Sequence, residues 1–322
     1  MHKVLDTRKK TAGVALVTAL ALLLFFSILA TVYARYAMLE TEATRLDLDK
    51  DYARQTARAG IEATLGEIEV ALEGGKAPDD RYEFTLPVYV AENRDQGFSE
   101  GVIGGVAKVV VTDESAKINL NFAPVRVLEA ILNIDANTAR QIRQELPKIG
   151  VPDAENQGRW LTSIDDLATR GLLNERKVAS LNRDLLTVHS VLDPARPDAF
   201  INLNSASAPV IAAVLNVPGD VAEAVVKNRP YSSLEELVAV TGTTPAMFNV
   251  TPDPEAPAGL PRELSFTSRC FRIRCEGSLI NKEIPDKPLA ADWVEAIVLF
   301  PEKGAPVVRY WTESHPEEPA AT

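Results

Sequence analysis

Side chains that commonly carry out acid–base, nucleophilic or metal chemistry are few in this sequence and lie far apart. The three histidines are His2, His189 and His315, and only His189 falls in a region that we expect to be folded. No Ser/His/Asp or Cys/His combination can be recognised. Nothing in the sequence therefore argues for an enzyme, and we expect no catalytic residues.

Two acidic pairs occupy matching positions in two similar segments. Asp165-Asp166 lies in TSIDDLA and Glu235-Glu236 lies in SSLEELV. A carboxylate near the start of a helix is usually solvated or accepts hydrogen bonds from the first turn. We expect that structural role for both pairs rather than a shared acid–base function.

The two cysteines, Cys270 and Cys275, lie in the alternating segment RCFRIRC. Their odd spacing on a strand would place the thiols on opposite faces, about 16 Å apart. A disulfide needs Cα atoms closer than about 7 Å. We therefore predict two separate, partly buried thiols and no metal site formed by this pair alone.

The elements that position these residues begin with a basic segment before an apolar helix. MHKVLDTRKKTAG carries Lys3, Arg8, Lys9 and Lys10, and no charge follows until Arg35. The apolar run from Val14 to Tyr33 is long enough to cross a bilayer, and the basic flank predicts a cytoplasmic N-terminus. A conventional secretory signal peptide fits less well, because no small-residue cleavage site follows. A plain uncleaved signal anchor stays open.

The helical pattern continues beyond the membrane segment, with one apolar stripe spaced by three or four residues. The stripe consists of Ala53, Ala57, Ile61, Leu65, Ile68 and Leu72. Alternating strand patterns follow near Phe84 and in VAKVVVT, which comes after a Gly-Gly turn signal, and return as SFTSRCFRIRC, WVEAIVLF and VVRYWT. Strands on both sides of a helical block predict a helical domain inserted into an α+β domain.

The helical block contains the motif INLN twice, at 118–121 and 201–204, 83 positions apart. The apolar positions that follow correspond without a gap. Each motif reads as a short extended segment that buries Ile and Leu, and its last Asn, or the next residue, can cap the following helix. We interpret the copies as packing modules of one helical domain.

This pattern resembles helix-hairpin-helix modules, which often bind a phosphate at a helix N-terminus. The hairpins here are degenerate, since NIDANTA has no glycine and carries Asp135, and NVPGDVA keeps only Gly219 and adds Asp220. Without the basic leader the net charge is about −14, which is unfavourable for nucleic acid. We expect packing rather than nucleic-acid binding, with a membrane-tethered DNA-uptake module as the alternative.

The predicted elements follow the order found in type IV pilin-like proteins: a leader, an apolar helix, an amphipathic helix and then strands. RKKTAGVALVTALALLL, DESAKINLN and the second INLN together resemble the K-subunit minor pseudopilin of the type II secretion system, over nearly the whole chain. The resemblance implies a pilin-like fold, in which a long N-terminal helix packs on an antiparallel sheet. A large all-helical domain with two degenerate helix-hairpin-helix-like repeats would be inserted into it.

The same resemblance implies cleavage by a prepilin peptidase between Gly13 and Val14, followed by methylation of the new amine. The protein would be held in the inner membrane by one helix, with its bulk in the periplasm. It would sit at the tip of a short filament with the I- and J-type minor subunits. The fifth mature residue is Glu in most pilin-like proteins and Thr18 here, which fits a subunit that starts the filament and needs no carboxylate for an earlier amine.

Some relatives in this family bind calcium, and the oxygen-rich segment ENRDQGFSE, 92–100, could supply ligands. No calcium-loop spacing is present, so we name no metal ligands and expect no cofactor. A minor pilin of a related fibre is the other alternative.

The predicted organisation is as follows: leader 1–13, transmembrane helix 14–33, amphipathic helix and first strands 34–117, helical domain 118–250 with repeats near 118–187 and 201–250, returning strands 262–312, and tail 313–322.

Overall fold

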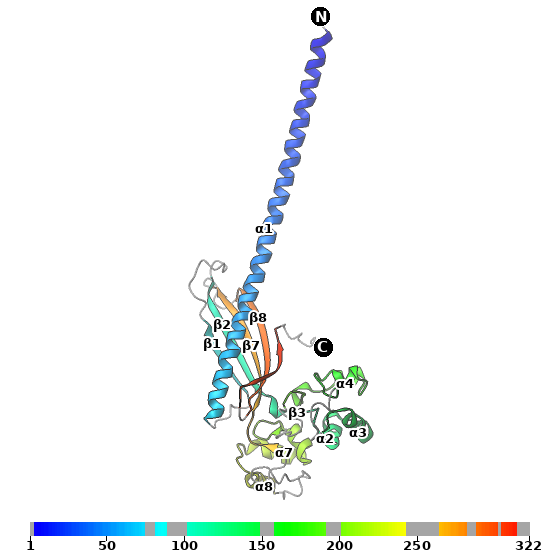
Figure 1. The fold of residues 1–322 in the computed structure, drawn as a ribbon, viewed down its shortest axis with the longest axis vertical. Helices are drawn as coiled ribbons and strands as arrows, with labels where there is room; N and C mark the ends of the chain where they lie inside the picture. The colour runs from blue at the N-terminus through cyan, green and yellow to red at the C-terminus, as the bar shows by residue number, and fades with distance from the viewer. Residues whose placement is uncertain are drawn as a thin grey trace.

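The computed structural model describes residues 3–74, 81–88, 102–148, 158–190, 201–242, 264–281, 288–301 and 304–313. One long N-terminal helix packs on an antiparallel sheet, and short helices gather at one end of that sheet (Figure 1). This is the pilin-like α+β arrangement that the sequence predicts. The calcium-candidate segment 92–100 and the last nine residues of the tail lie outside the described ranges. The same holds for TPDPEAPAGLP, 251–261, whose prolines and glycines predict a linker before the returning strands.

The N-terminal helix α1 runs without interruption over Lys3–Glu73. Its predicted stripe packs on the sheet, with Ala53, Ala57, Ile61 and Ile68 buried and Leu65 and Leu72 partly buried in the same cluster. The stripe forms because residues three or four apart share one face of a helix. The periodicity prediction is confirmed.

The five strands of the sheet are arranged in the order β1-β2-β7-β8-β9, and all neighbours are antiparallel. Their bounds are β1 Arg81–Val88, β2 Val102–Asp113, β7 Cys270–Asn281, β8 Ala290–Leu299 and β9 Val307–Thr312. The central neighbours β2 and β7 are far apart in sequence. The short helices lie between them along the chain, which is the topology of an insertion.

The inserted segment consists of two halves, each of which contains one INLN segment. The first contains η2 Glu114–Ala116, β3 Ile118–Asn119, α2 Val125–Leu132, α3 Ala136–Glu145, α4 Asp166–Thr169, α5 Glu175–Ala179, η4 Arg183–Leu185 and β4 Leu186–Thr187. The second contains β5 Ile201–Asn202, α6 Ala208–Leu215, α7 Gly219–Lys227, α8 Leu234–Thr241 and β6 Leu264–Ser265. Both halves contribute to one hydrophobic cluster, which is separate from the cluster between α1 and the sheet.

Two strand predictions need correction. Gly104-Gly105 does not form a turn but lies inside β2, beside a register shift after Val102. The segment SFTSRCFRIRC is not one strand, because Ser265 belongs to β6, which pairs in parallel with β5, and the sheet strand β7 begins at Cys270. Alternation along the sequence could not show that the two ends of this segment pair with different strands.

The cysteine prediction is confirmed in its geometry. Both thiols are free, Cys275 packs in the cluster under α1, and Cys270 packs with Ile297 and Leu299 on the other face. Both are wholly rather than partly buried. Burial raises the pKa of the Cys275 thiol to about 12, and that of Cys270 is also raised. The two thiols are therefore side chains of the hydrophobic cores and are not poised as nucleophiles.

Candidate membrane-anchoring and assembly site

The N-terminal half of α1 extends away from the folded part of the molecule (Figure 1). Its large apolar side chains from Leu16 to Leu39 are exposed. Within the described residues, α1 is the one single helix that is long and apolar enough to cross a membrane. The bent pair α6 and α7 meets the same composition test, but Val210 and Ile211 of α6 are buried in the helical core.

The three predicted site residues all lie on α1. Gly13 and Val14 lie near its start, and Thr18 is exposed one turn further along. The structure thus places them on the exposed helix, away from the sheet and the inserted helices. Their predicted roles in processing and filament initiation stay predictions.

The other end of α1 is held so close to the sheet that glycine is needed at the contact. A Cβ atom on Gly277 of β7 would lie 2.0 Å from the carbonyl oxygen of Ala53 and 2.4 Å from the amide nitrogen of Ala57. A Cβ atom on Gly60 of α1 would lie 2.6 Å from the Cys275 sulfur. Helix and sheet backbones therefore nearly touch, which fixes the direction in which the exposed half of α1 leaves the domain.

The first INLN segment connects three parts of the inserted chain. The Asn121 side chain donates to the carbonyl oxygens of Leu161 and Val188, both at 3.1 Å, and accepts from the Leu161 amide at 2.8 Å. Asn119 accepts from the Asn121 amide and donates to the Ser190 hydroxyl. The segment is buried, so each bond satisfies a polar group that water does not reach.

The second INLN segment makes corresponding contacts. The Asn204 side chain donates to the carbonyl oxygens of Tyr231 and Phe266 and accepts from the Tyr231 amide at 2.7 Å. Asn202 accepts from the Asn204 amide and donates to the Ser268 hydroxyl. Each copy also pairs in parallel with a short strand at the end of its own half, β4 or β6. The helix-hairpin-helix comparison itself stays a prediction.

The predicted capping role of Asn121 and Asn204 is wrong. The N-cap of α2 is Pro124 and that of α6 is Ser207, three residues after each asparagine, and neither Pro124 nor Ser207 makes a side-chain capping bond. The asparagines instead bind backbone groups of distant segments. In the two acidic pairs, Asp166 and Glu236 accept from the amides of Thr162 and Ser232, which precede the helices α4 and α8, and this is the structural role expected for these carboxylates.

The first hairpin satisfies its own helix terminus. The Asp135 carboxylate accepts from the amides of Asn137 and Thr138 and from the Thr138 hydroxyl, and these bonds lower the pKa of Asp135. A carboxylate already occupies the place where a phosphate would bind. This arrangement supports packing over nucleic-acid binding.

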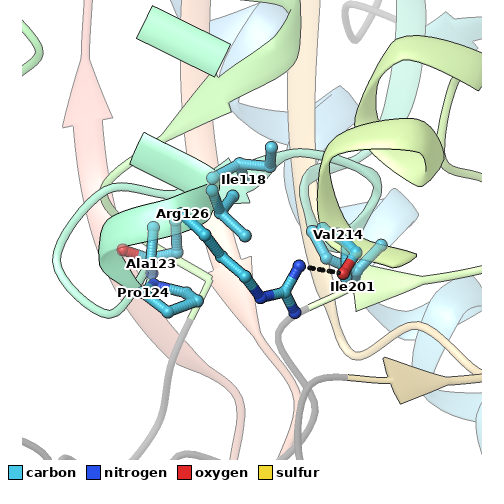
Figure 2. A pocket seen from close by; sticks show the side chains of 8 residues that line it. Ile118, Ala123, Pro124, Arg126, Ile201 and Val214 are labelled. Carbon is cyan, nitrogen blue, oxygen red and sulfur yellow. Dashed lines mark hydrogen bonds between the residues drawn. The ribbon is translucent and has the colours of Figure 1, made fainter. Parts of the chain in front are cut away.

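The two halves meet at a small cavity of about 20 Å³, room for roughly one water molecule. Figure 2 shows Arg126 reaching across it from α2 toward α6. Its guanidinium donates to the carbonyl oxygen of Val214 at 2.8 Å. The remaining lining is mostly apolar, from Ile118, Ala123, Pro124, Val127 and Ile201. The cavity therefore lies in the contact between the two halves and is too small for an organic ligand.

The insertion is joined to the sheet by a buried carboxylate at the end of β2. Asp113 accepts from the Ser115 amide at 2.7 Å, from Asn202 at 3.1 Å, and from the hydroxyls of Ser205 and Ser268. Burial raises the pKa of Asp113 despite these bonds. One side chain therefore links the sheet to both ends of the second half.

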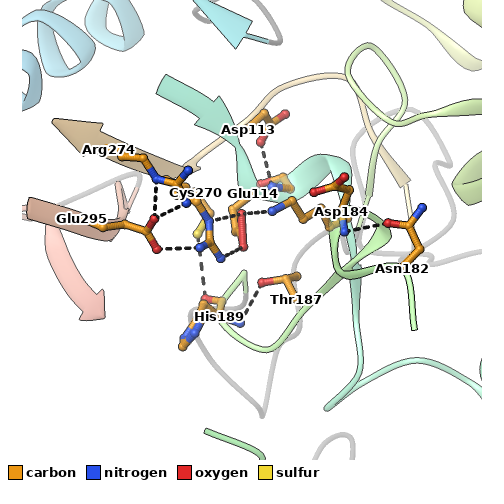
Figure 3. A network of polar contacts seen from close by, with 12 residues as sticks. Asp113, Glu114, Asn182, Asp184, Thr187, His189, Cys270, Arg274 and Glu295 are labelled. Carbon is orange, nitrogen blue, oxygen red and sulfur yellow. Dashed lines mark hydrogen bonds and ion pairs between the residues drawn. The ribbon is translucent and has the colours of Figure 1, made fainter. Parts of the chain in front are cut away.

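The next residue, Glu114, forms a buried ion-pair network (Figure 3). Arg272 binds Glu114 through two nitrogens and binds Glu295 at 2.7 Å, while Lys117 also reaches Glu114 at 2.8 Å. Burial raises the pKa of Glu114, but the Arg272 guanidinium and Lys117 outweigh it and leave the pKa at about 2. Arg274 completes the network on Glu295.

We predict that Glu114 makes the protein acid-sensitive. Its pKa is about 2 when folded and 4.5 ordinarily. Its stabilisation is therefore complete above pH 4.5 and is lost as the pH falls toward 2, a loss of about 3 kcal/mol. Urea unfolding of Glu114→Gln at pH 7, 4 and 2.5 should show a large destabilisation at pH 7 that shrinks toward pH 2.5. Asp113 titrates in the original protein and in the variant alike, so its contribution cancels in the difference between their free energies of unfolding. A difference in free energy of unfolding that stays the same at all three pH values would contradict this role of Glu114.

His189, the one histidine expected in a folded region, lies at this junction. Its ring packs 5.6 Å from that of Tyr310, and its carbonyl oxygen lies 3.9 Å from the Cys270 sulfur. Burial lowers the pKa of His189. Among the described residues, no group of three or more His, Cys, Asp or Glu side chains is arranged to hold a metal.

Sequence reasoning did not single out Asp113, Glu114 or Arg272 as functional. The signal was present as two adjacent acids after the β-branched run VVVT and an Arg within a strand, since charges in a buried strand must be paired. DESAKINLN carried the family resemblance, but the sequence does not show which cations face its acids.

No protein-family model and no curated protein matches this chain. The chain is similar to a solved chain of the GspK-GspI-GspJ complex from the type 2 secretion system of enterotoxigenic Escherichia coli, with a TM-score of 0.51 and 15% identity. The match covers 85% of this chain and 99% of that chain. The protein thus has the pilin-like fold of a component of that secretion complex.

Proposed function

We propose that this chain is a structural minor pseudopilin of the K type, at the tip of a type II secretion pseudopilus. It would initiate assembly with the I- and J-type subunits and serve the export of folded proteins across the outer membrane. The observation that supports this best is the combination of an exposed apolar helix, a five-stranded sheet and a large insertion between β2 and β7. The fold likeness extends over 99% of a chain from a GspK-GspI-GspJ complex.

Location and processing form part of the proposal. The chain crosses the inner membrane once through α1, its bulk lies in the periplasm, and a prepilin peptidase removes the leader. The role is structural rather than enzymatic, and neither a cofactor nor nucleic acid takes part.

Co-purification tests the proposal. The full chain, tagged at its C-terminus and solubilised in mild detergent, should bring down the I- and J-type minor subunits in a defined complex. Its deletion should abolish secretion. Recovery with subunits of a surface pilus would favour the related-fibre alternative, and salt-sensitive DNA binding at micromolar protein would favour the uptake alternative.

We predict cleavage after Gly13. Co-expression with a prepilin peptidase should give an intact mass that begins at Val14, plus a methyl group. Gly13→Leu should block cleavage, because the bulky side chain replaces the small residue at the cut. Gly66→Leu is the matched control, since it lies on the same helix far from the leader. Normal processing of Gly13→Leu, or a cut after Tyr33, would contradict the prediction.

We predict that Thr18 can lose its hydroxyl with little consequence. A threonine hydroxyl in a membrane helix can bond to a carbonyl of the preceding turn, so Thr18→Val should leave assembly nearly intact. Thr18→Glu should not improve assembly, because a carboxylate without an amine partner costs about 2.5–3.5 kcal/mol in the bilayer. Secretion and crosslinking report the outcome. A gain with Thr18→Glu would mean that an earlier subunit supplies an amine, contrary to the tip position.

A further inference from the structure

His189 lies where the inserted helices meet the sheet, and the backbone on both sides of it is fixed to the insertion. Its chain neighbours Val188 and Ser190 are buried. Asn121 donates to the carbonyl oxygen of Val188 at 3.1 Å. Asn119 donates to the hydroxyl of Ser190 at 3.2 Å. Position 189 therefore cannot move far unless the bonds of the first INLN segment also break.

From this fixed position, His189 contacts two strands of the sheet. Its ring lies 5.6 Å from that of Tyr310 on β9, with the ring planes tilted by 41°. Its carbonyl oxygen lies 3.9 Å from the sulfur of Cys270, the first residue of β7. Strand β9 is an edge of the five-stranded sheet and has β8 as its neighbour there. The ring of His189 is thus a contact by which the insertion holds an edge strand.

The charges around the ring oppose a further proton. His189 lies beside the Glu114 network in Figure 3. The charged groups that act on its ring belong to η2 and its C-cap, to β7 and to β9, and they are Glu114, Lys117, Arg272 and Arg309. Three of these four groups are cations, and the carboxylate of Glu114 is already bound by Arg272 and Lys117. An imidazolium would therefore meet net repulsion at a place where its hydration is incomplete.

The folded junction accordingly favours the neutral ring. Burial is the largest cause that lowers the pKa of His189, Glu114 opposes this effect, and the surrounding cations lower the pKa further. The stability that the neutral ring contributes is therefore complete above the ordinary pKa of 6.5 and is lost as the pH falls below that value.

We propose that the contact between His189 and Tyr310 is a pH-sensitive switch, in which the neutral ring holds β9 to the inserted helices and a proton taken up from solvent releases it. The Glu114 ion pairs stay formed at mildly acidic pH, because the pKa of Glu114 is about 2. The insertion therefore remains attached to β2 and β7 while its contact with β9 opens. This inference is independent of the proposed function.

Two measurements on the full chain in mild detergent test the switch. Slow exchange of the ring C2 hydrogens, followed by mass spectrometry between pH 4 and 9, should give a midpoint for His189 below 6.5. Amide exchange, corrected for the intrinsic effect of pH, should show that segments 186–190 and 307–312 open at least about threefold more often at pH 5.5 than at pH 7.

Three variants identify the group responsible. His189→Gln keeps a neutral polar side chain and should remove the increase in opening at pH 5.5. His189→Lys places a permanent cation there and should give the increased opening already at pH 7. His315→Gln is the matched control and should behave like the original protein. Burial raises the pKa of Asp113, but this carboxyl is present in every variant, so its contribution cancels in their comparison.

The outcomes that overturn the switch are equally definite. A midpoint of His189 at or above 6.5 would mean that the junction does not resist the proton. Increased opening at pH 5.5 that persists in His189→Gln would assign the pH dependence to another group. If opening increases by the same factor throughout the insertion and the sheet, the proton destabilises the whole fold, and the local release of β9 is wrong.

Discussion

Replacing Gly277 with valine is expected to separate α1 from the sheet. Even a methyl group there would lie 2.0 Å from the carbonyl oxygen of Ala53 and 2.4 Å from the amide nitrogen of Ala57, and both atoms belong to helix backbone that cannot rotate aside. The helix would have to move outward along its whole contact with the sheet. Overpacking alone typically costs 1–3 kcal/mol. With the buried stripe also opened, we expect a loss of about 4 kcal/mol or more.

The measurement is urea unfolding of the full chain in detergent, followed by fluorescence of its tryptophans. Gly66→Ala is the control, because no atom lies within 4 Å of its added methyl group. That change removes a glycine from a helix interior and should stabilise the protein by about 0.5–1 kcal/mol. Opposite signs for two glycine substitutions would show that backbone proximity decides the effect. A neutral Gly277→Val would mean that α1 does not lie on β7 as described.

Replacing Asn121 with alanine is expected to cost nearly as much. The fully buried side chain makes three hydrogen bonds to backbone groups of Leu161 and Val188. Alanine would leave the Leu161 amide without this acceptor in a place that water does not reach, and each buried group left unpaired costs about 1–3 kcal/mol. We expect a loss of about 4 kcal/mol in the stability of the inserted helices.

Two further variants identify the cause. Asn121→Asp keeps the shape but places carboxylate oxygens against two carbonyl oxygens, so it should be as damaging as alanine at pH 7. Asn137→Ala changes an exposed asparagine of the same half and should fall within about 0.5 kcal/mol of the original protein. Hydrogen exchange at the Leu161 amide should rise in Asn121→Ala, which removes the acceptor Oδ1 of this amide. Unchanged exchange would show that another group satisfies this amide.

The sequence predicted the parts of the fold that depend on local periodicity. The stripe from Ala53 to Leu72 repeats every three or four residues, and that spacing predicts a helix with one buried face. The opposite faces of Cys270 and Cys275 follow in the same way from a period of two. Self-similarity revealed the two INLN segments without any knowledge of their contacts.

The remaining contacts depend on partners that no local rule identifies. Asn121 was interpreted as a cap because capping is a relation between near neighbours, whereas its actual partners lie 40 and 67 residues away. Glu114 and Arg272 are 158 residues apart. The close contact at Gly277 likewise requires the path of α1 over β7. The roles of these residues can be recognised only in the folded structure, which shows their distant partners.

The pairing of β2 with β7 has a consequence for how the chain folds. These central strands cannot meet until the residues between them have been synthesised, and closing so long a loop is entropically costly and slow. The two ends of the inserted segment are joined by Asp113, whose carboxylate binds Asn202 and Ser268. Helices that fold first would therefore bring Asp113 and Ser268 together and shorten the effective loop to a few residues. The insertion would then act as the nucleus on which the sheet closes, and α1 would find its contact surface last.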